Sequence, residues 1–218
     1  MFARNIGSCS VVVHHEALSR LRPGFKSRHE HWVNIIMALH LRANGEAMVT
    51  QVELRESETL DLINNSPSLS KFIEWLDELG KRPTLKNLEK RLLELNIDLE
   101  NLSKYLGYTD DEYQRNVVKK TENYELVLIC WKPGQKTPIH DHKGSDCAFL
   151  ILKGVSTESI YRKQDGGLMK TEVRRYAPGQ VCAADEPDIH KISNDEDINL
   201  VNLHLYSPPL KGFNIYEG

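Results

Sequence analysis

The stretch CWKPGQKTPIHDHKGSDCAFLILKG, residues 130–154, carries the most structural information in this chain. It places His140 and His142 two residues apart, and Cys147 follows five residues later. On a β-strand, residues i and i+2 point to the same face. The spacing therefore predicts that the two imidazoles lie on one strand and face one interior.

Short segments rich in β-branched and aromatic residues surround this stretch, and Pro-Gly, Gly-Gly and Asn-Asp turns separate them. The predicted strands are residues 124–132, 147–153, 156–162, 170–176, 180–184 and 198–206. Closely spaced strands with such turns are typical of an antiparallel sandwich or barrel. We therefore expect a mainly β domain.

The segment from about residue 66 to 108 follows the helical period instead. Its apolar residues predict helices over about 66–80, 85–95 and 98–106. We interpret their apolar faces as core-facing and assign them no catalytic role.

The first 50 residues differ from the rest in charge. They hold six Lys or Arg and three Glu, a net charge of +3, against −3 for the whole chain. We expect residues 1–50 to be a basic, loosely ordered extension with a short helix over 32–41, or to precede a natural start at Met48. Residues 51–218 are expected to form the domain, with helices to about 110 and a barrel over 113–218.

The composition excludes several classes of protein. The chain has 218 residues, a pI near 6.3 and a mean hydropathy of −0.47, so neither a nucleic-acid partner nor a membrane is expected. Its four cysteines have neither C-x-x-C spacing nor the density of a disulfide scaffold. These features predict a cytoplasmic protein, and we expect a monomer.

A third histidine with a different local setting, His190, follows the Pro178-Gly179 turn and begins an H-x3-N motif. Three neutral imidazoles suit a divalent ion such as Fe, Zn, Ni or Cu and leave coordination positions open for catalysis. We predict that His140, His142 and His190 bind one metal ion. The pairs His14-His15 and His29-x-His31 are not expected to bind metal.

The region around His140 and His142 resembles the first cupin motif, with Cys147 where many cupins carry a metal-binding Glu. The whole run 130–154, with YQRN before it and HLYSPP after it, is similar to the cysteine dioxygenase type I family. The likeness covers roughly residues 113–209. It implies a cupin jelly-roll barrel behind a small helical segment.

The resemblance also implies a function. Fe(II) held by His140, His142 and His190 would oxidise L-cysteine with O2 to cysteine sulfinic acid. Iron supplies the one-electron chemistry that O2 activation needs and zinc lacks. Arg115 matches the arginine that holds the substrate carboxylate, a role that suits a planar guanidinium. Tyr113 is expected to line the substrate pocket or to serve packing alone.

Three more positions match catalytic residues of the family. Tyr206 would place its hydroxyl beside the iron, His204 would orient it, and Cys147 would join it through a thioether bond. Asn202 replaces a residue that is often Ser, so the hydrogen bonds around His204 are expected to differ.

Alternative functions stay open. The nearest is oxidation of another small thiol, such as 3-mercaptopropionate or homocysteine. The chain could also be a non-catalytic, metal-binding cupin sensor, or a zinc hydrolase or isomerase, although no carboxylate general base has metal-site spacing.

Overall fold

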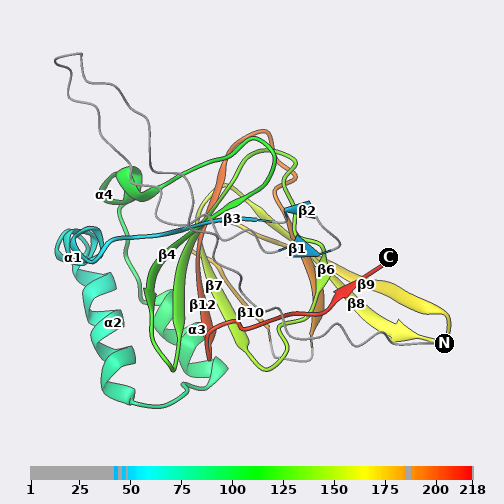
Figure 1. Ribbon diagram of the computed structural model, residues 1–218, viewed down its shortest axis with the longest axis horizontal. Coiled ribbons are helices and arrows are strands. Elements are labelled where there is room, and N and C mark those ends of the chain that lie inside the picture. The colour runs from blue at the N-terminus through cyan, green and yellow to red at the C-terminus, as the bar shows by residue number, and fades with distance from the viewer. Residues whose placement is uncertain (1–41, 44–45, 48, 185–187, 218) are drawn as a thin grey trace, which may run out of the picture. The chain divides into compact units, whose positions relative to one another are not determined.

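The strands between Thr50 and Tyr216 form two β-sheets (Figure 1). The computed structural model describes residues 42–43, 46–47, 49–184 and 188–217. The six-stranded sheet has the order β10-β7-β12-β5-β4-β3 and the five-stranded sheet the order β13-β6-β11-β8-β9. A separate pair joins the two-residue strands β1 (Arg42–Ala43) and β2 (Glu46–Ala47).

The bounds of the strands follow from the structure. The six-stranded sheet contains β3 (Thr50–Glu53), β4 (Gln114–Lys120), β5 (Glu125–Trp131), β7 (Asp146–Lys153), β10 (Val181–Ala184) and β12 (Leu200–Ser207). The five-stranded sheet contains β6 (Ile139–His140), β8 (Ser156–Gln164), β9 (Gly167–Tyr176), β11 (Ile189–Ser193) and β13 (Ile215–Tyr216).

The chain crosses repeatedly from one sheet to the other. After β5 it enters β6 in the second sheet, returns to β7, and later alternates through β10, β11, β12 and β13. All strand pairs are antiparallel except β3 with β4. This two-sheet crossover pattern is that of a jelly roll, which confirms the predicted mainly β, cupin-type barrel.

Alternation along the strands produces two apolar cores. Inward-facing residues such as Val127, Phe149 and Ile151 meet Ile192 of the second sheet and fill the barrel. Residues one position along, such as Leu126 and Leu150, face outward and pack against the helices. The central strands of the six-stranded sheet are therefore buried on both faces.

Helices cover the outer face of the six-stranded sheet (Figure 1). They are α1 (Glu56–Asn64), α2 (Pro67–Leu79), α3 (Leu85–Leu93) and α4 (Leu99–Leu102), followed by the 3-10 helix η1 (Ser103–Tyr105). Pro67 begins α2, and Gly80 ends it with a φ of 55°, a left-handed conformation that favours glycine. None of the helices in the described ranges combines the length and apolar character of a membrane span.

Six predicted strands correspond to β5, β7, β8, β9, β10 and β12, and the three predicted helices to α2, α3 and α4 with η1. The sequence pattern did not predict α1, β3, β4, β11 or β13, and the strand that it predicted through His140 and His142 is the shorter β6. The helix predicted over 32–41 and the histidine pairs His14-His15 and His29-x-His31 lie outside the described residues, as does most of the predicted N-terminal extension.

Candidate metal centre

Three histidines that are distant in sequence converge inside the barrel. His140, His142 and His190 each offer a ring nitrogen, and these three atoms lie within 4.8 Å of one another. The Nε2 atoms of His142 and His190 are 3.2 Å apart. His142 and His190 are buried, whereas His140 is half-buried. The structure therefore brings the three predicted ligands together.

Sheet pairing and one loop position these rings. His140 ends β6 and is the register partner of His190 in β11. His142 lies beyond the strand, before a turn in which Lys143 has a φ of 39° and Gly144 a φ of 96°. The prediction that His140 and His142 share one strand is therefore wrong, because β6 stops at His140. The loop, not strand alternation, turns His142 toward the other rings.

Acceptors on the far side of two rings determine where their protons lie. The Nδ1 of His140 is 3.0 Å from the carbonyl oxygen of Pro138, and the Nδ1 of His190 is 2.7 Å from Oε1 of Glu158. A carbonyl or carboxylate oxygen only accepts hydrogen bonds, so each Nδ1 carries the hydrogen. The Nε2 atom of each ring is then left with a lone pair.

Burial favours the neutral forms of His140 and His142, and neutral imidazole is the form that binds metals. Burial and the neighbouring His190 lower the pKa of His140 to about 3. Burial and the other histidines also lower the pKa of His142 well below its usual value. Two ligand nitrogens bound to one ion at about 2.0–2.1 Å lie about 3–3.5 Å apart. The observed Nε2 separation of 3.2 Å fits that geometry.

A small cavity borders the cluster. Its volume is about 30 Å³, and its wall includes the three histidines, Tyr113, Trp131, Cys147, His204 and Tyr206. A water molecule needs at least about 10–15 Å³ by this measure, so the cavity has room for about two.

Tyr206, His204 and Cys147 meet at this cavity. Tyr206 in β12 is the register partner of Cys147 in β7, and such partners have Cβ atoms about 4.5–5.5 Å apart. The Tyr206 hydroxyl is 3.3 Å from Nδ1 of His204, and Cys147 Sγ is 3.7 Å from the same nitrogen. Burial raises the pKa of both the Cys147 thiol and the Tyr206 hydroxyl.

Asn202 continues the same face of β12 but does not contact His204 through a hydrogen bond. Its Oδ1 accepts a hydrogen bond of 3.0 Å from Nε1 of Trp131. The Nε2 of His204 is buried and has no hydrogen-bond partner among the described residues. Asn202 therefore bonds to Trp131 rather than to His204.

Arg115 lies in β4 beside the cavity but is not part of its wall. Its guanidinium carbon is 5.3 Å from the centre of the Tyr206 ring, and Nη2 is 3.4 Å from the buried Glu125 carboxylate. Arg115 Nε is buried and unpartnered among the described residues. Tyr113 does line the cavity and stacks on Trp131, with ring centres 4.2 Å apart.

Asp141, between the two clustered histidines, ties their loop to the C-terminal segment. Its carboxylate accepts hydrogen bonds from the Asn214 backbone (2.9 Å), the Asn214 side chain (2.8 Å) and the Tyr216 hydroxyl (2.7 Å). The Phe213 ring also lies 6.0 Å from that of His140. Residues 213–216 therefore pack directly against the histidine loop.

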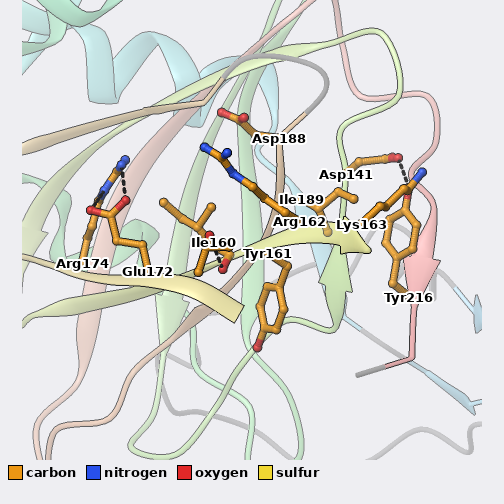
Figure 2. Close-up of a pocket in the computed structure, with 11 residues that line it drawn as sticks. Asp141, Ile160, Tyr161, Arg162, Lys163, Glu172, Arg174, Asp188, Ile189 and Tyr216 are labelled. Carbon is orange, nitrogen blue, oxygen red and sulfur yellow. Dashed lines mark hydrogen bonds and ion pairs between the residues drawn. The ribbon is translucent and has the colours of Figure 1, made fainter. Parts of the chain in front are cut away.

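A larger hollow of about 510 Å³ includes residues of β8, β9 and β13 (Figure 2). Several of its polar and charged side chains contact one another. Arg174 donates to Glu172 at 2.8 Å, Tyr216 donates to Asp141, and Lys163 lies 5.1 Å from the centre of the Tyr216 ring. Among the described residues it presents no buried, unpartnered polar atom. The histidine cavity is therefore the better candidate site.

The sequence of this chain matches the family model described as cysteine dioxygenase type I over residues 68–218. That match covers well over half of the chain. The chain belongs to the cysteine dioxygenase type I family. The resemblance inferred from residues 130–154 and their flanking motifs is confirmed.

Curated members of the cysteine dioxygenase type I family align with part of the chain. The cysteine dioxygenase type 1 of Danio rerio is 30% identical over 122 residues, which cover 52% of this chain and 60% of that protein. The Rattus norvegicus protein is 31% identical over 112 residues, covering 48% and 56%. The human protein is 27% identical over 151 residues, covering 65% and 75%. The chain thus spans somewhat more than half of the first two relatives.

Solved structures with similar folds include a Thermus thermophilus protein, with 22% identity and a TM-score of 0.43 over 52% of this chain and 97% of that one. A Klebsiella pneumoniae protein with a double-stranded β-helix domain has 21% identity and a TM-score of 0.43, over 54% and 95%.

Sequence reasoning missed three acidic residues near the candidate site of this chain. Glu158 contacts His190, Glu125 contacts Arg115, and Asp141 contacts the C-terminal segment. A charged residue inside a predicted strand was the available signal for Glu125 and Glu158. That signal could not show which face of the sheet Glu125 and Glu158 occupy, because the face depends on strand pairing.

Proposed function

We propose that this chain is an Fe(II)-dependent thiol dioxygenase that adds both atoms of O2 to the sulfur of L-cysteine and forms cysteine sulfinic acid. The thiol and O2 together contain every atom and electron of the product, so no external reductant is required. The observation that carries the proposal is the convergence of three ring nitrogens within 4.8 Å in a member of this family.

In this proposal His140, His142 and His190 hold the metal. Two of them expose Nε2 lone pairs because Nδ1 is engaged elsewhere. Bound Fe(II) would supply the one-electron chemistry that O2 activation needs. The ligand set differs from the common triad of two histidines and one carboxylate. A neutral ligand set leaves the site more positive, which favours an anionic thiolate.

Arg115 is the proposed partner of the substrate carboxylate, and Tyr113 a wall of the pocket. Glu125 occupies one terminal nitrogen of the guanidinium, whereas the Nε–H is buried without a partner among the described residues. A buried donor without a partner costs about 1–3 kcal/mol, which a carboxylate acceptor would recover. Charge-assisted hydrogen bonds of this kind are stronger than hydrogen bonds between neutral groups.

Tyr206 is proposed to hold its hydroxyl at the reacting atoms, with His204 orienting it. Because Tyr206 and Cys147 are register partners, we also propose a thioether between Cys147 Sγ and a ring carbon next to the Tyr206 hydroxyl. Forming this bond removes two hydrogen atoms, one from the thiol and one from the ring, with O2 as the oxidant. The bond would lock the phenol against the cavity.

The thioether can be detected on a denaturing gel. Wild-type protein is expected to give two bands, with the faster one growing during turnover, because a cross-link makes the denatured chain more compact. Cys147→Ser should give a single, slower band. The matched control is Cys130→Ser, which alters another buried free cysteine and should keep both bands. A doublet that persists in Cys147→Ser would exclude the proposed pairing.

Oxygen uptake by protein loaded with Fe(II) without air tests the function as a whole. We expect consumption that depends on L-cysteine, with one O2 used per sulfinic acid formed and both product oxygens labelled by ¹⁸O2. Faster uptake with 3-mercaptopropionate or homocysteine would reassign the substrate. No uptake with any thiol would favour the metal-binding sensor, and inactivity with iron but hydrolysis with zinc would favour the zinc enzyme.

We infer further that the protein acts in the cytoplasm as a monomer. The three described cysteines, Cys130, Cys147 and Cys182, are buried and free, as in a reducing compartment. Size-exclusion chromatography with light scattering tests the oligomeric state.

A further inference from the structure

Glu158 is a buried carboxylate that the proposed chemistry leaves without a role. It lies in β8, is only 3% exposed, and is the register partner of Ile192 in β11. This position is diagonal to His190, two residues away along β11. Its Oε1 accepts the hydrogen bond of 2.7 Å from His190 Nδ1.

Glu158 has no direct ion pair with any described Lys or Arg side chain. Among the described residues its carboxylate contacts the His190 ring, and no Lys or Arg nitrogen lies within 4.0 Å of it. Its other oxygen accepts a 3.1 Å hydrogen bond from the neutral Tyr176 hydroxyl. A buried carboxylate without a compensating cation is costly. A cation bound at the histidine cluster would compensate this charge through the imidazole of His190.

We propose that Glu158 is a positioning residue of the metal centre, which fixes the tautomer of His190 and supplies through it the negative charge that three neutral ligands lack. The proposal rests on the proposed function, since it needs a cation at the histidine cluster. In this arrangement the carboxylate that is common in iron sites does not bind the metal directly. It is the Glu158 carboxylate, which is hydrogen-bonded to the proposed ligand His190.

Tyr176 supports this arrangement from the far side. Its hydroxyl holds the second carboxylate oxygen, so the order Tyr176–Glu158–His190 forms a continuous chain of hydrogen bonds that ends at the cluster. A carboxylate held at both oxygens cannot rotate away from the imidazole. Such partners raise the basicity of a ligand and set its orientation.

The test is an anaerobic Fe(II) titration, in competition with a colorimetric chelator, of wild type and Glu158→Gln. Glutamine is nearly isosteric, and its Oε1 still accepts from Nδ1, so it removes the charge while preserving the shape. We expect Fe(II) to bind about 10- to 100-fold more weakly. Tyr176→Phe should weaken binding in the same direction but less. Glu94→Gln, which alters an exposed glutamate paired with Arg91 on α3, should bind like wild type.

The Fe(III)/Fe(II) midpoint potential provides a readout that a purely structural role would not change. Loss of the buried negative charge should raise the potential in Glu158→Gln, while Glu94→Gln should leave it unchanged. Equal affinity and equal potential in wild type and Glu158→Gln would overturn the inference. If the wild-type protein itself bound no Fe(II), both the proposed function and this inference would be wrong. Thermal unfolding monitors the fold of each variant.

Discussion

His142→Ala is expected to lose bound iron and, with it, thiol-dependent oxygen uptake. The variant removes one of two ring nitrogens that face each other at 3.2 Å. Replacing a group that only supports a ligand typically costs 10- to 100-fold in metal affinity. Removing a ligand itself should therefore weaken Fe(II) binding by more than about 100-fold. Anaerobic Fe(II) titration and oxygen-electrode assays with L-cysteine measure the two effects.

The matched control is His204→Ala. It removes another buried histidine of the same cavity, but His204 is not one of the three clustered rings. Iron content should survive in this variant while turnover falls, because His204 is proposed to orient Tyr206. If His142→Ala retained wild-type iron affinity, the three-histidine site would be wrong. Circular dichroism should show the same strand content in both variants.

Arg115→Gln is expected to raise the KM for L-cysteine much more than it lowers kcat. Truncating one partner of a buried, charged hydrogen-bond pair costs about 2–5 kcal/mol. The lower end of that range corresponds to about 30-fold in KM. Steady-state kinetics over a range of cysteine concentrations separate the two constants. An unchanged KM would remove Arg115 from the substrate site.

Arg115→Gln also affects stability, because Arg115 is the ion-pair partner of Glu125, and a second substitution at Glu125 controls for this effect. Arg115→Gln leaves the Glu125 carboxylate buried with only Lys120 at 3.6 Å among the described cations, so the variant should also unfold at a lower temperature. The double variant Arg115→Gln/Glu125→Gln removes both buried charges and should recover stability but keep the high KM. Arg91→Gln, at an exposed ion pair, should leave KM unchanged.

The fold could be predicted where side-chain pattern and turn chemistry agree. Strands such as β5 and β7 are apolar runs because they are buried on both faces, and a Gly-containing turn follows each of them. The strand β4, with the sequence QRNVVKK, is mostly polar and shows no clear alternation. The two-residue strands β6 and β13 are too short for any period. These strands are determined by pairing across the sheet, which local sequence does not contain.

The residues of the candidate site also differ in whether the sequence could predict them. The three histidines were predictable because their spacing and setting match a family motif, although His142 reaches the cluster by a loop. The neighbours Glu158 and Glu125 were not, because their partners lie 32 and 10 residues away in sequence. Their contacts depend on the register of β8 with β11 and of β4 with β5. Only the folded chain specifies those registers.

The hydrogen bonds of Asp141 have a mechanical consequence. Asp141 lies between His140 and His142 in the sequence. A displacement of Asn214 or Tyr216 that moves Asp141 would therefore shift both imidazoles. Metal binding and the packing of residues 213–216 against the histidine loop should then be thermodynamically linked, so that each stabilises the other. Iron loading is therefore expected to protect residues 213–216 from proteolysis, although they are not among the three clustered histidines.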